Sequence, residues 1–161
     1  MRAAVLLVVV AAALGGFTSG VASGTSCTRA TASAAIRATK PHAPSLAGGS
    51  VVVTPNEVDG LICVDFTRDG RTDLAFTVAS GGTAGDLAWV ALARTASGWR
   101  VVHAQGGYKL GLYRVGTDLV DSQPVYEKKD PNCCPTGGFD HTRWHWNGTR
   151  LVLVRSYHTS S

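Results

Sequence analysis

Four cysteines are the residues of this chain with the most direct chemistry. Cys27, Cys63, Cys133 and Cys134 make an even number, and the last two are adjacent. In an oxidising compartment an even count is typical of two disulfides, and four cysteines allow three pairings. A bond between neighbours closes a very small ring and strains the peptide between them. We therefore expect Cys27 and Cys63 each to bond one member of the adjacent pair.

Two histidines near the end of the chain add further ligands and acid–base groups. His141 and His145 lie four residues apart, so they share one face of a strand that contains both. With Cys133 and Cys134 they could form a zinc site, although the spacing matches no usual zinc pattern. They could also act as acid or base, with Asp140 nearby. A solvated strand face explains the same histidines with fewer assumptions.

The segment from Asp65 to Asp73 reads DFTRDGRTD, with an Asp at every fourth position. It resembles the calcium loop of the FG-GAP/VCBS repeat family, in which D-x-[DN]-x-D-G-x-x-D joins two strands. Calcium takes about six to eight oxygen ligands, and a tight loop can supply them. The resemblance implies a Ca²⁺ site formed by the side chains of Asp65, Thr67, Asp69 and Asp73 and the backbone carbonyl of Arg71.

Two features of this segment differ from the family pattern. Thr67 stands where the family has Asp or Asn, and Arg68 and Arg71 bring positive charge close to the loop. The other interpretation is a metal-free β-hairpin, in which the Asp side chains accept hydrogen bonds from the turn backbone. Both interpretations stay open on the sequence.

The common catalytic signatures are missing from the sequence. It contains no G-x-S-x-G elbow, no phosphate-binding glycine loop and no H-E-x-x-H. The formal net charge is +4, and the Lys and Arg residues are scattered instead of forming a basic stripe. We therefore expect no nucleic-acid partner, and no cofactor other than the calcium ion implied above.

The first 24 residues predict export. Met1 and Arg2 form a charged start, residues 3–14 are apolar, and small residues follow up to Gly24. The apolar run is too short to span a bilayer, which takes about 20 apolar residues. Lipidation at Cys27 would need a Leu-type residue where Gly24 stands. We expect residues 1–24 to be a cleaved signal peptide, which leaves a secreted or envelope-associated domain without a membrane span.

The rest of the chain is long enough for one domain with a core of its own. Residues 25–50 predict a short helix over Ser26–Thr39 and then a linker that contains two prolines and two glycines. Residues 51–161 predict an antiparallel β domain, because short apolar runs alternate with turn residues. The run at 86–94 is apolar on both faces, so we expect it at the centre of a sheet. The clearest strands are 61–64, 74–79, 86–94, 99–103, 109–115, 119–126, 139–146 and 149–157.

The expected architecture is α+β and mainly β: a short N-terminal helix on an antiparallel β-meander of about seven to nine strands, stapled by disulfides. Its last two strands predict a hairpin across Asn147-Gly148, a pair that favours a type I′ turn. In that hairpin Trp146 faces Thr149 and Trp144 faces Leu151. Alternation then places the tryptophans on the core face. The opposite face holds His141, Arg143 and His145.

The complete pattern resembles small uncharacterised secreted proteins of high-GC Gram-positive bacteria. The features that carry the resemblance are the signal, the short helix, the Asp/Gly hairpin, and the Cys-Cys-Pro loop before a Trp-x-Trp hairpin. It implies location and general shape, and no substrate. We expect a secreted or envelope-associated non-catalytic binding module whose partner is an extracellular or cell-wall protein. The alternative is a small extracellular hydrolase that uses His141 or His145.

Overall fold

The computed structural model describes residues 26–45 and 48–160. The predicted signal peptide, residues 1–24, lies outside the described residues. The elements in chain order are α1 (Arg29–Thr39), β1 (His42–Pro44), β2 (Ser50–Val52), a 3₁₀ turn (Pro55–Glu57), β3 (Val58–Val64), β4 (Asp73–Ala79), β5 (Asp86–Thr95), β6 (Gly98–Gly106), β7 (Gly111–Val115), β8 (Asp118–Pro124), β9 (Phe139–Trp146) and β10 (Leu151–Thr159).

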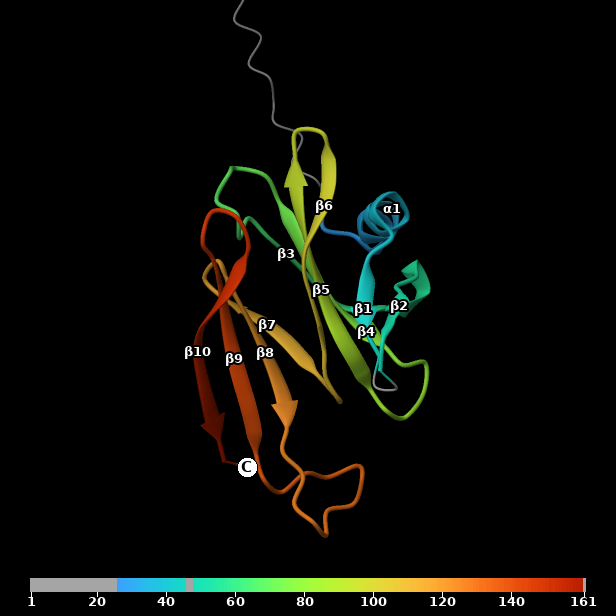
Figure 1. Ribbon diagram of the computed structural model, residues 1–161, viewed down its shortest axis with the longest axis vertical. Coiled ribbons are helices and arrows are strands. Elements are labelled where there is room, and N and C mark those ends of the chain that lie inside the picture. The colour runs from blue at the N-terminus through green and yellow to red at the C-terminus, as the bar shows by residue number, and fades with distance from the viewer. Residues whose placement is uncertain (1–25, 46–47, 161) are drawn as a thin grey trace, which may run out of the picture.

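The described residues form three layers, which lie side by side in Figure 1. A four-stranded antiparallel sheet, β3-β4-β5-β6, is the middle layer, and a second, β10-β9-β8-β7, packs on one side of it. The helix α1 and the two-stranded sheet β1-β2 lie on the other side. Both large sheets are meanders in which consecutive strands pair. The mainly β architecture with one helix on an antiparallel meander is therefore confirmed.

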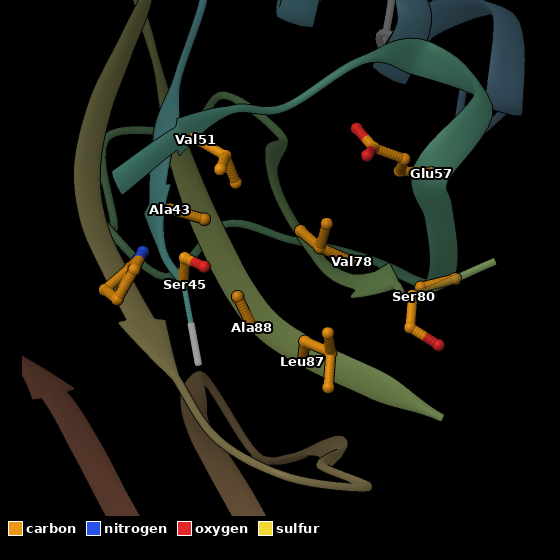
Figure 2. A pocket seen from close by; sticks show the side chains of 10 residues that line it. Ala43, Ser45, Val51, Glu57, Val78, Ser80, Leu87 and Ala88 are labelled. Carbon is orange, nitrogen blue, oxygen red and sulfur yellow. The ribbon is translucent and has the colours of Figure 1, made fainter. Parts of the chain in front are cut away.

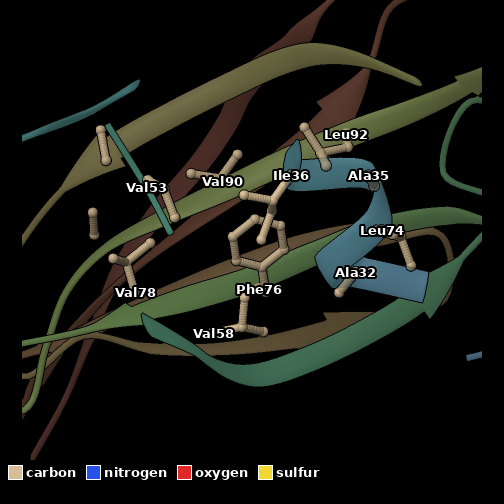
Figure 3. Close-up of a cluster of buried hydrophobic side chains, with 12 residues drawn as sticks. Ala32, Ala35, Ile36, Val53, Val58, Leu74, Phe76, Val78, Val90 and Leu92 are labelled. Carbon is tan, nitrogen blue, oxygen red and sulfur yellow. The ribbon is translucent and has the colours of Figure 1, made fainter. Parts of the chain in front are cut away.

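The helix α1 and the middle sheet enclose the first core cluster (Figure 3). The helix begins after Thr28, whose side chain accepts a hydrogen bond from the Thr31 N–H. It ends at Lys40, whose left-handed backbone donates its N–H to the Ile36 carbonyl. Its buried face packs on alternate residues of the sheet. The cluster includes Ala32, Ala35, Ile36, Leu74, Phe76, Val90 and Leu92.

The second core cluster lies between the two large sheets. It contains Phe66, Trp89, Leu119 and Leu151, and Trp144 and Trp146 pack against it. The prediction that the tryptophan face of the last hairpin lies in the core is therefore confirmed. The strand β5 lies between β4 and β6, and its residues 88–93 are buried on both faces, as its apolar sequence predicted.

The predicted disulfide pairing is wrong. Cys27 bonds Cys63, and Cys133 bonds Cys134. Cys63 packs against the core cluster on the α1 side of the middle sheet, and Cys27 lies just before α1. The adjacent cysteines instead lie in the loop between β8 and β9, in the third layer. The Cys27–Cys63 bond therefore joins the helical layer to the middle sheet, and the Cys133–Cys134 bond stays within one loop of the third layer.

The linker predicted at the end of residues 25–50 also contains structure. The strands β1 and β2 pair in register from His42 opposite Val52 to Pro44 opposite Ser50. The Gly48 N–H donates to the Ser45 carbonyl, and the Ser45 N–H to the Gly49 carbonyl. Both glycines have positive φ, of 89° and 75°. The glycines that suggested a flexible connection thus close a short hairpin.

The last hairpin has a longer loop than predicted. Trp146 lies opposite Leu151 and Trp144 opposite Leu153, two residues further along than in the expected register. The reason is the Asn147 side chain, whose Oδ1 accepts hydrogen bonds at 3.0 Å from the N–H groups of residues 149 and 150. This shift of two residues keeps Leu151 and Leu153 on the tryptophan face, as predicted. A β-bulge between Leu153 and Arg155 then adds one more residue, so Arg155 and Tyr157 lie opposite Arg143 and His141, on the face where Val152 and Val154 were expected. Within the described residues, no helix is long and apolar enough to cross a membrane.

Candidate functional site

The largest gathering of polar and aromatic side chains lies on the face of β7–β10 that points away from the middle sheet. This sheet forms one outside layer of the molecule (Figure 1). The strand register places residues from all four strands on that face. We call it the outer face and define it by Tyr113, Asp118, His141, Arg143, His145, Arg155 and Tyr157.

An acidic residue anchors one end of the outer face. The Arg143 Nε donates to Oδ2 of Asp118 at 2.6 Å, and the Nδ1 of His145 lies 2.7 Å from Oδ1. The Asp118 carboxylate is nearly buried. Burial alone would raise the pKa of Asp118, but the hydrogen bonds and charges of His145 and Arg143 outweigh it and lower that pKa. This carboxylate therefore stays ionised and holds the Arg143 and His145 side chains in place.

Hydroxyl groups organise the other end of the outer face. The Tyr113 and Tyr157 hydroxyls are 2.8 Å apart, and the Tyr113 hydroxyl lies 3.2 Å from Nδ1 of His141. The Nε2 of His141 lies 2.9 Å from the Thr159 hydroxyl, and its ring stacks on Tyr157 with 4.7 Å between centroids. Burial, together with the hydrogen bond to Tyr157, raises the pKa of Tyr113 to about 12. Tyr113 is therefore a neutral phenol over the physiological pH range.

The side chains of the outer face pack on one another. Val120 points outward between Tyr113 and Arg143 in the strand register, and yet it is 0% exposed. The guanidinium of Arg155 lies 5.2 Å from the centroid of the Tyr157 ring. The long side chains thus form a continuous layer over Val120. Side chains held in this way lose little conformational entropy when a partner binds.

A shallow hollow of about 460 Å³ lies over the ends of β9 and β10 next to the outer face. Beside it the Nδ1 of His158 lies 2.9 Å from Oδ1 of Asp140. Aromatic, hydroxyl and carboxylate groups meet there. Its lining residues are Asp140, His141, Thr142, Ser156 and Tyr157.

The two histidines of the hydrolase alternative are engaged in different ways. His145 has the carboxylate partner that orients a catalytic histidine, but Arg143 shares that carboxylate. Among residues 26–45 and 48–160, the only hydrogen-bond partner of the His145 ring is Asp118. His141 has a hydroxyl at each ring nitrogen, from Tyr113 and Thr159. The structure thus places no activated nucleophile beside the His145–Asp118 pair in the described chain.

The predicted calcium loop is filled by hydrogen bonds among its own groups. The Asp65 carboxylate accepts from the N–H groups of Asp69 and Gly70, at 3.1 and 2.8 Å. The Asp69 carboxylate accepts from the Arg71 N–H and from its guanidinium, at 2.9 and 2.8 Å. These carboxylates therefore face N–H donors.

The last carboxylate of the loop, Asp73, points into the protein. It is 0% exposed and accepts from the Thr67 N–H, the Thr67 hydroxyl and the Arg94 N–H. In the part of the chain that the structure describes, no three His, Cys, Asp or Glu side chains meet as metal ligands. Hydrogen bonds within the loop order it in this structure, as the metal-free hairpin interpretation expects, and calcium binding stays a prediction. The zinc alternative does not fit, because Cys133 and Cys134 are bonded to each other.

Sequence reasoning did not single out a polar cluster between the two large sheets. The His103 ring lies between Trp89 and Trp144, with centroids 4.3 and 4.4 Å away. The Trp144 Nε1 donates to the buried Asp121 carboxylate at 2.5 Å. The His103 Nε2 and the Trp89 Nε1 are buried without a hydrogen-bond partner among the described residues. The one sequence signal for this cluster was the alternation along β9, which placed Trp144 on the core face.

A second, smaller hollow lies on the opposite side of the molecule, between the β1-β2 hairpin and the ends of β4 and β5 (Figure 2). Its volume is about 200 Å³, and most of its lining is apolar, including Ala43, Val78 and Leu87. The carboxylate in its lining, Glu57, accepts the Thr54 N–H at 2.6 Å as part of a capping box. This hollow therefore has an apolar lining, and its one carboxylate is already engaged in a hydrogen bond.

Several residues of the outer face were also missed from the sequence. The three cationic residues of β9 were placed correctly on the face opposite the tryptophans. Tyr113 and Asp118 had no distinguishing local pattern, and they join the site because β7 pairs with β8 and β8 with β9. Simple alternation along β10 puts Tyr157 on the tryptophan face, and the β-bulge after Leu153 brings it to the outer face instead. Comparisons of this chain with known protein families, curated proteins and solved structures give no match.

Proposed function

We propose that this chain is a secreted or envelope-associated, non-catalytic binding module that contacts a protein partner through the outer face. The observation that carries the proposal is the packed, hydrogen-bonded set of tyrosine, histidine and arginine side chains on an outside sheet layer. The partner is an extracellular or cell-wall protein, in keeping with the predicted signal peptide.

Two disulfides support the proposed compartment. The described residues contain no free cysteine, and both bonds persist only where thiol reductants are scarce. The Cys27–Cys63 bond joins the segment before α1 to β3, so it fastens the first layer to the middle one. A module that works outside the cell gains from such a cross-link because no chaperone maintains it there.

The residue types of the outer face support partner binding. Tyr and Arg are enriched among the residues that contribute most to protein interfaces. Here Arg143 is held by Asp118, and Tyr113 and Tyr157 are held by each other. Because these side chains are already ordered, little entropy is lost when a partner packs on them.

The charge of the outer face indicates the chemistry of the partner. Arg143 and Arg155 face a single carboxylate, that of Asp118, whose charge Arg143 already neutralises in part. Arg155 is exposed and stacks on Tyr157 without a carboxylate partner among its described contacts. A complementary surface therefore carries Asp or Glu side chains next to apolar ones.

The hydrolase alternative rests on the 2.7 Å contact between Asp118 and His145. It requires a nucleophile or a bound water beside His145, and a substrate that enters the hollow next to His141. A His145→Ala variant separates the two proposals. Loss of a hydrolytic activity in that variant, with the fold intact, would favour the enzyme.

A matched pair of charge reversals tests the binding proposal. Arg155→Glu changes the outer face, whereas Arg37→Glu makes the same change on the exposed side of α1, in the opposite layer. The mature chain is immobilised and exposed to culture supernatant and cell-wall extract of the organism that makes it. We expect a captured protein whose affinity falls about tenfold or more with Arg155→Glu and stays unchanged with Arg37→Glu.

The same experiment can overturn the proposal. Equal capture by the wild type and both variants would show that the outer face is not the interface. Capture lost with Arg37→Glu and kept with Arg155→Glu would move the interface to the helical layer. Equal melting temperatures of the three proteins would show that the differences arise at the surface.

A further inference from the structure

The two disulfides of this chain differ in exposure and setting. Cys133 and Cys134 are both exposed, in the loop that joins β8 to β9. Cys63 is half-buried and packs against the core cluster beneath α1. Thiol–disulfide exchange requires an attacking thiolate to reach a sulfur atom along the line of the bond, so exposure decides which disulfide reacts. Both cysteines of the adjacent pair are exposed, whereas the other bond has one exposed cysteine, Cys27, and one that packs against the core, Cys63.

The two bonds also differ in what they constrain. Cys133 and Cys134 are neighbours, so their bond closes only a small ring within the loop. The Cys27–Cys63 bond spans a sequence separation of 36 and joins two layers. The constraint that a cross-link places on the unfolded chain grows with the length of the closed loop. Reducing the Cys133–Cys134 bond should therefore lower the free energy of unfolding only slightly, and reducing the Cys27–Cys63 bond should lower it much more.

Hydrogen bonds that do not involve sulfur hold the loop in place. Its neck is closed by the Val125 N–H donating to the Gly138 carbonyl, and by the Gly137 N–H donating to the Val125 carbonyl. Inside it, the Asp130 carboxylate accepts from the N–H groups of Glu127 and Thr136 and from the Thr136 hydroxyl, each at 2.7 Å. The loop thus has its own framework, independent of the disulfide.

Hydrogen bonds also hold Asn132, the residue before Cys133. The Asn132 carbonyl accepts from the Tyr126 hydroxyl at 2.8 Å and from the Lys109 ammonium, and its side-chain oxygen accepts from the Tyr108 hydroxyl. These contacts keep Cys133 and Cys134 at the surface whether or not they are bonded. They also bring the Lys109 charge close to the pair, and a nearby cation favours the thiolate form of a cysteine.

We propose that Cys133–Cys134 is a thiol-exchange site that low-molecular-weight or protein thiols reduce while the rest of the fold stays intact. The attacking thiolate bonds one sulfur of the pair as a mixed disulfide, and the other sulfur leaves as a thiolate. A second thiol attacks the mixed disulfide and releases the donor in its oxidised, disulfide form. Two thiols have then passed two electrons and two protons to the pair, which becomes a dithiol.

The folded full-length mature protein provides the test, with glutathione as the thiol. The protein is equilibrated at graded ratios of reduced to oxidised glutathione, quenched in acid and alkylated. Mass spectrometry of its peptides then reports the state of each cysteine. We expect Cys133 and Cys134 to be alkylated or bound to glutathione at a ratio about tenfold or more below that at which Cys27 and Cys63 open. The melting temperature of the selectively reduced protein should stay near that of the oxidised one.

A control and two contrary outcomes complete the test. In the Cys133→Ser/Cys134→Ser double variant the early reaction should vanish, while Cys27–Cys63 opens at an unchanged ratio. Simultaneous opening of both disulfides, or prior opening of Cys27–Cys63, would overturn the proposal. So would a cooperative loss of the fold when only the adjacent pair is reduced. The binding proposal above is tested separately, because Arg155 lies in β10 and Arg37 in α1, outside the loop that contains the two cysteines.

Discussion

The buried carboxylate of Asp73 accepts two hydrogen bonds from Thr67, one from its N–H and one from its hydroxyl, both at 2.9 Å. The other oxygen of Asp73 accepts the Arg94 N–H, from β5, at 2.8 Å. A single carboxylate at the start of β4 therefore fastens the Asp/Gly loop to the neighbouring strand. Burial raises the pKa of Asp73, with these hydrogen bonds acting in the opposite direction. The residue is part of the framework of the fold.

We expect Asp73→Asn to lower the free energy of unfolding by about 2 kcal/mol. An amide offers one oxygen where the carboxylate offers two, so a buried donor of Thr67 or Arg94 loses its acceptor. Urea unfolding followed by tryptophan fluorescence measures the change. The exposed Asp69→Asn in the same loop is the control, and its effect should stay within about 0.5 kcal/mol. Equal stability of the Asp73→Asn variant and the wild type would contradict this account of the loop.

We expect calcium to leave the stability of the protein unchanged. The carboxylates of Asp65 and Asp69 already accept backbone N–H groups, so the loop is ordered without an ion. Melting curves recorded with millimolar calcium and with a chelator should superimpose, since a ligand that binds the folded state raises the melting temperature. A calcium-dependent rise that disappears in Asp65→Asn would restore the metal site.

The stability of the protein should fall on acidification in part through His103. Burial lowers the pKa of His103 below its usual 6.5, so the folded protein keeps this ring neutral at pH values where the unfolded chain is protonated. The contribution is complete above pH 6.5 and is lost as the pH falls through 6.5 toward the folded pKa. The sign follows because the unfolded state binds more protons in that window.

The variant His103→Phe isolates this effect because it keeps a ring between Trp89 and Trp144. From about pH 7.5 to about pH 5 we expect the melting temperature to fall further in the wild type than in the variant. The other histidines are present in both proteins and cancel in the difference. Parallel melting temperatures across this range would show that His103 titrates as it does in the unfolded chain.

The two disulfides should contribute unequally to stability. Replacing Cys27 and Cys63 by Ser removes a cross-link with a sequence separation of 36. The chain-entropy argument gives about 4 kcal/mol for a loop of that size. Replacing Cys133 and Cys134 by Ser should cost less than about 1 kcal/mol, since almost no chain is enclosed. Urea unfolding of the two double variants measures both values, and equal losses would contradict the assignment of a structural and a peripheral disulfide.

Local patterns predicted much of the fold because they depend on neighbours in the chain. Alternation along β9 placed Trp144 and Trp146 in the core and His145 on the outer face, and the structure confirms each. The apolar run at 86–94 is the central strand β5. The Asn147 loop shows the limit of such patterns. A side chain that accepts two backbone N–H groups lengthened the turn, and a β-bulge after Leu153 moved Arg155 and Tyr157 to the outer face.

Local patterns were thus sufficient for the helix, for the strands of the two large sheets and for most of their buried faces, since periodicity and turn residues act over a few neighbours. The disulfide pairing followed from the three-dimensional packing, because it depends on which cysteines the folded chain brings together. The tertiary structure also decided that Asp73 binds Thr67 and Arg94, and that Tyr113 meets Tyr157 across the sheet. These contacts join residues from separate strands, and their distances follow from the packing of the sheets.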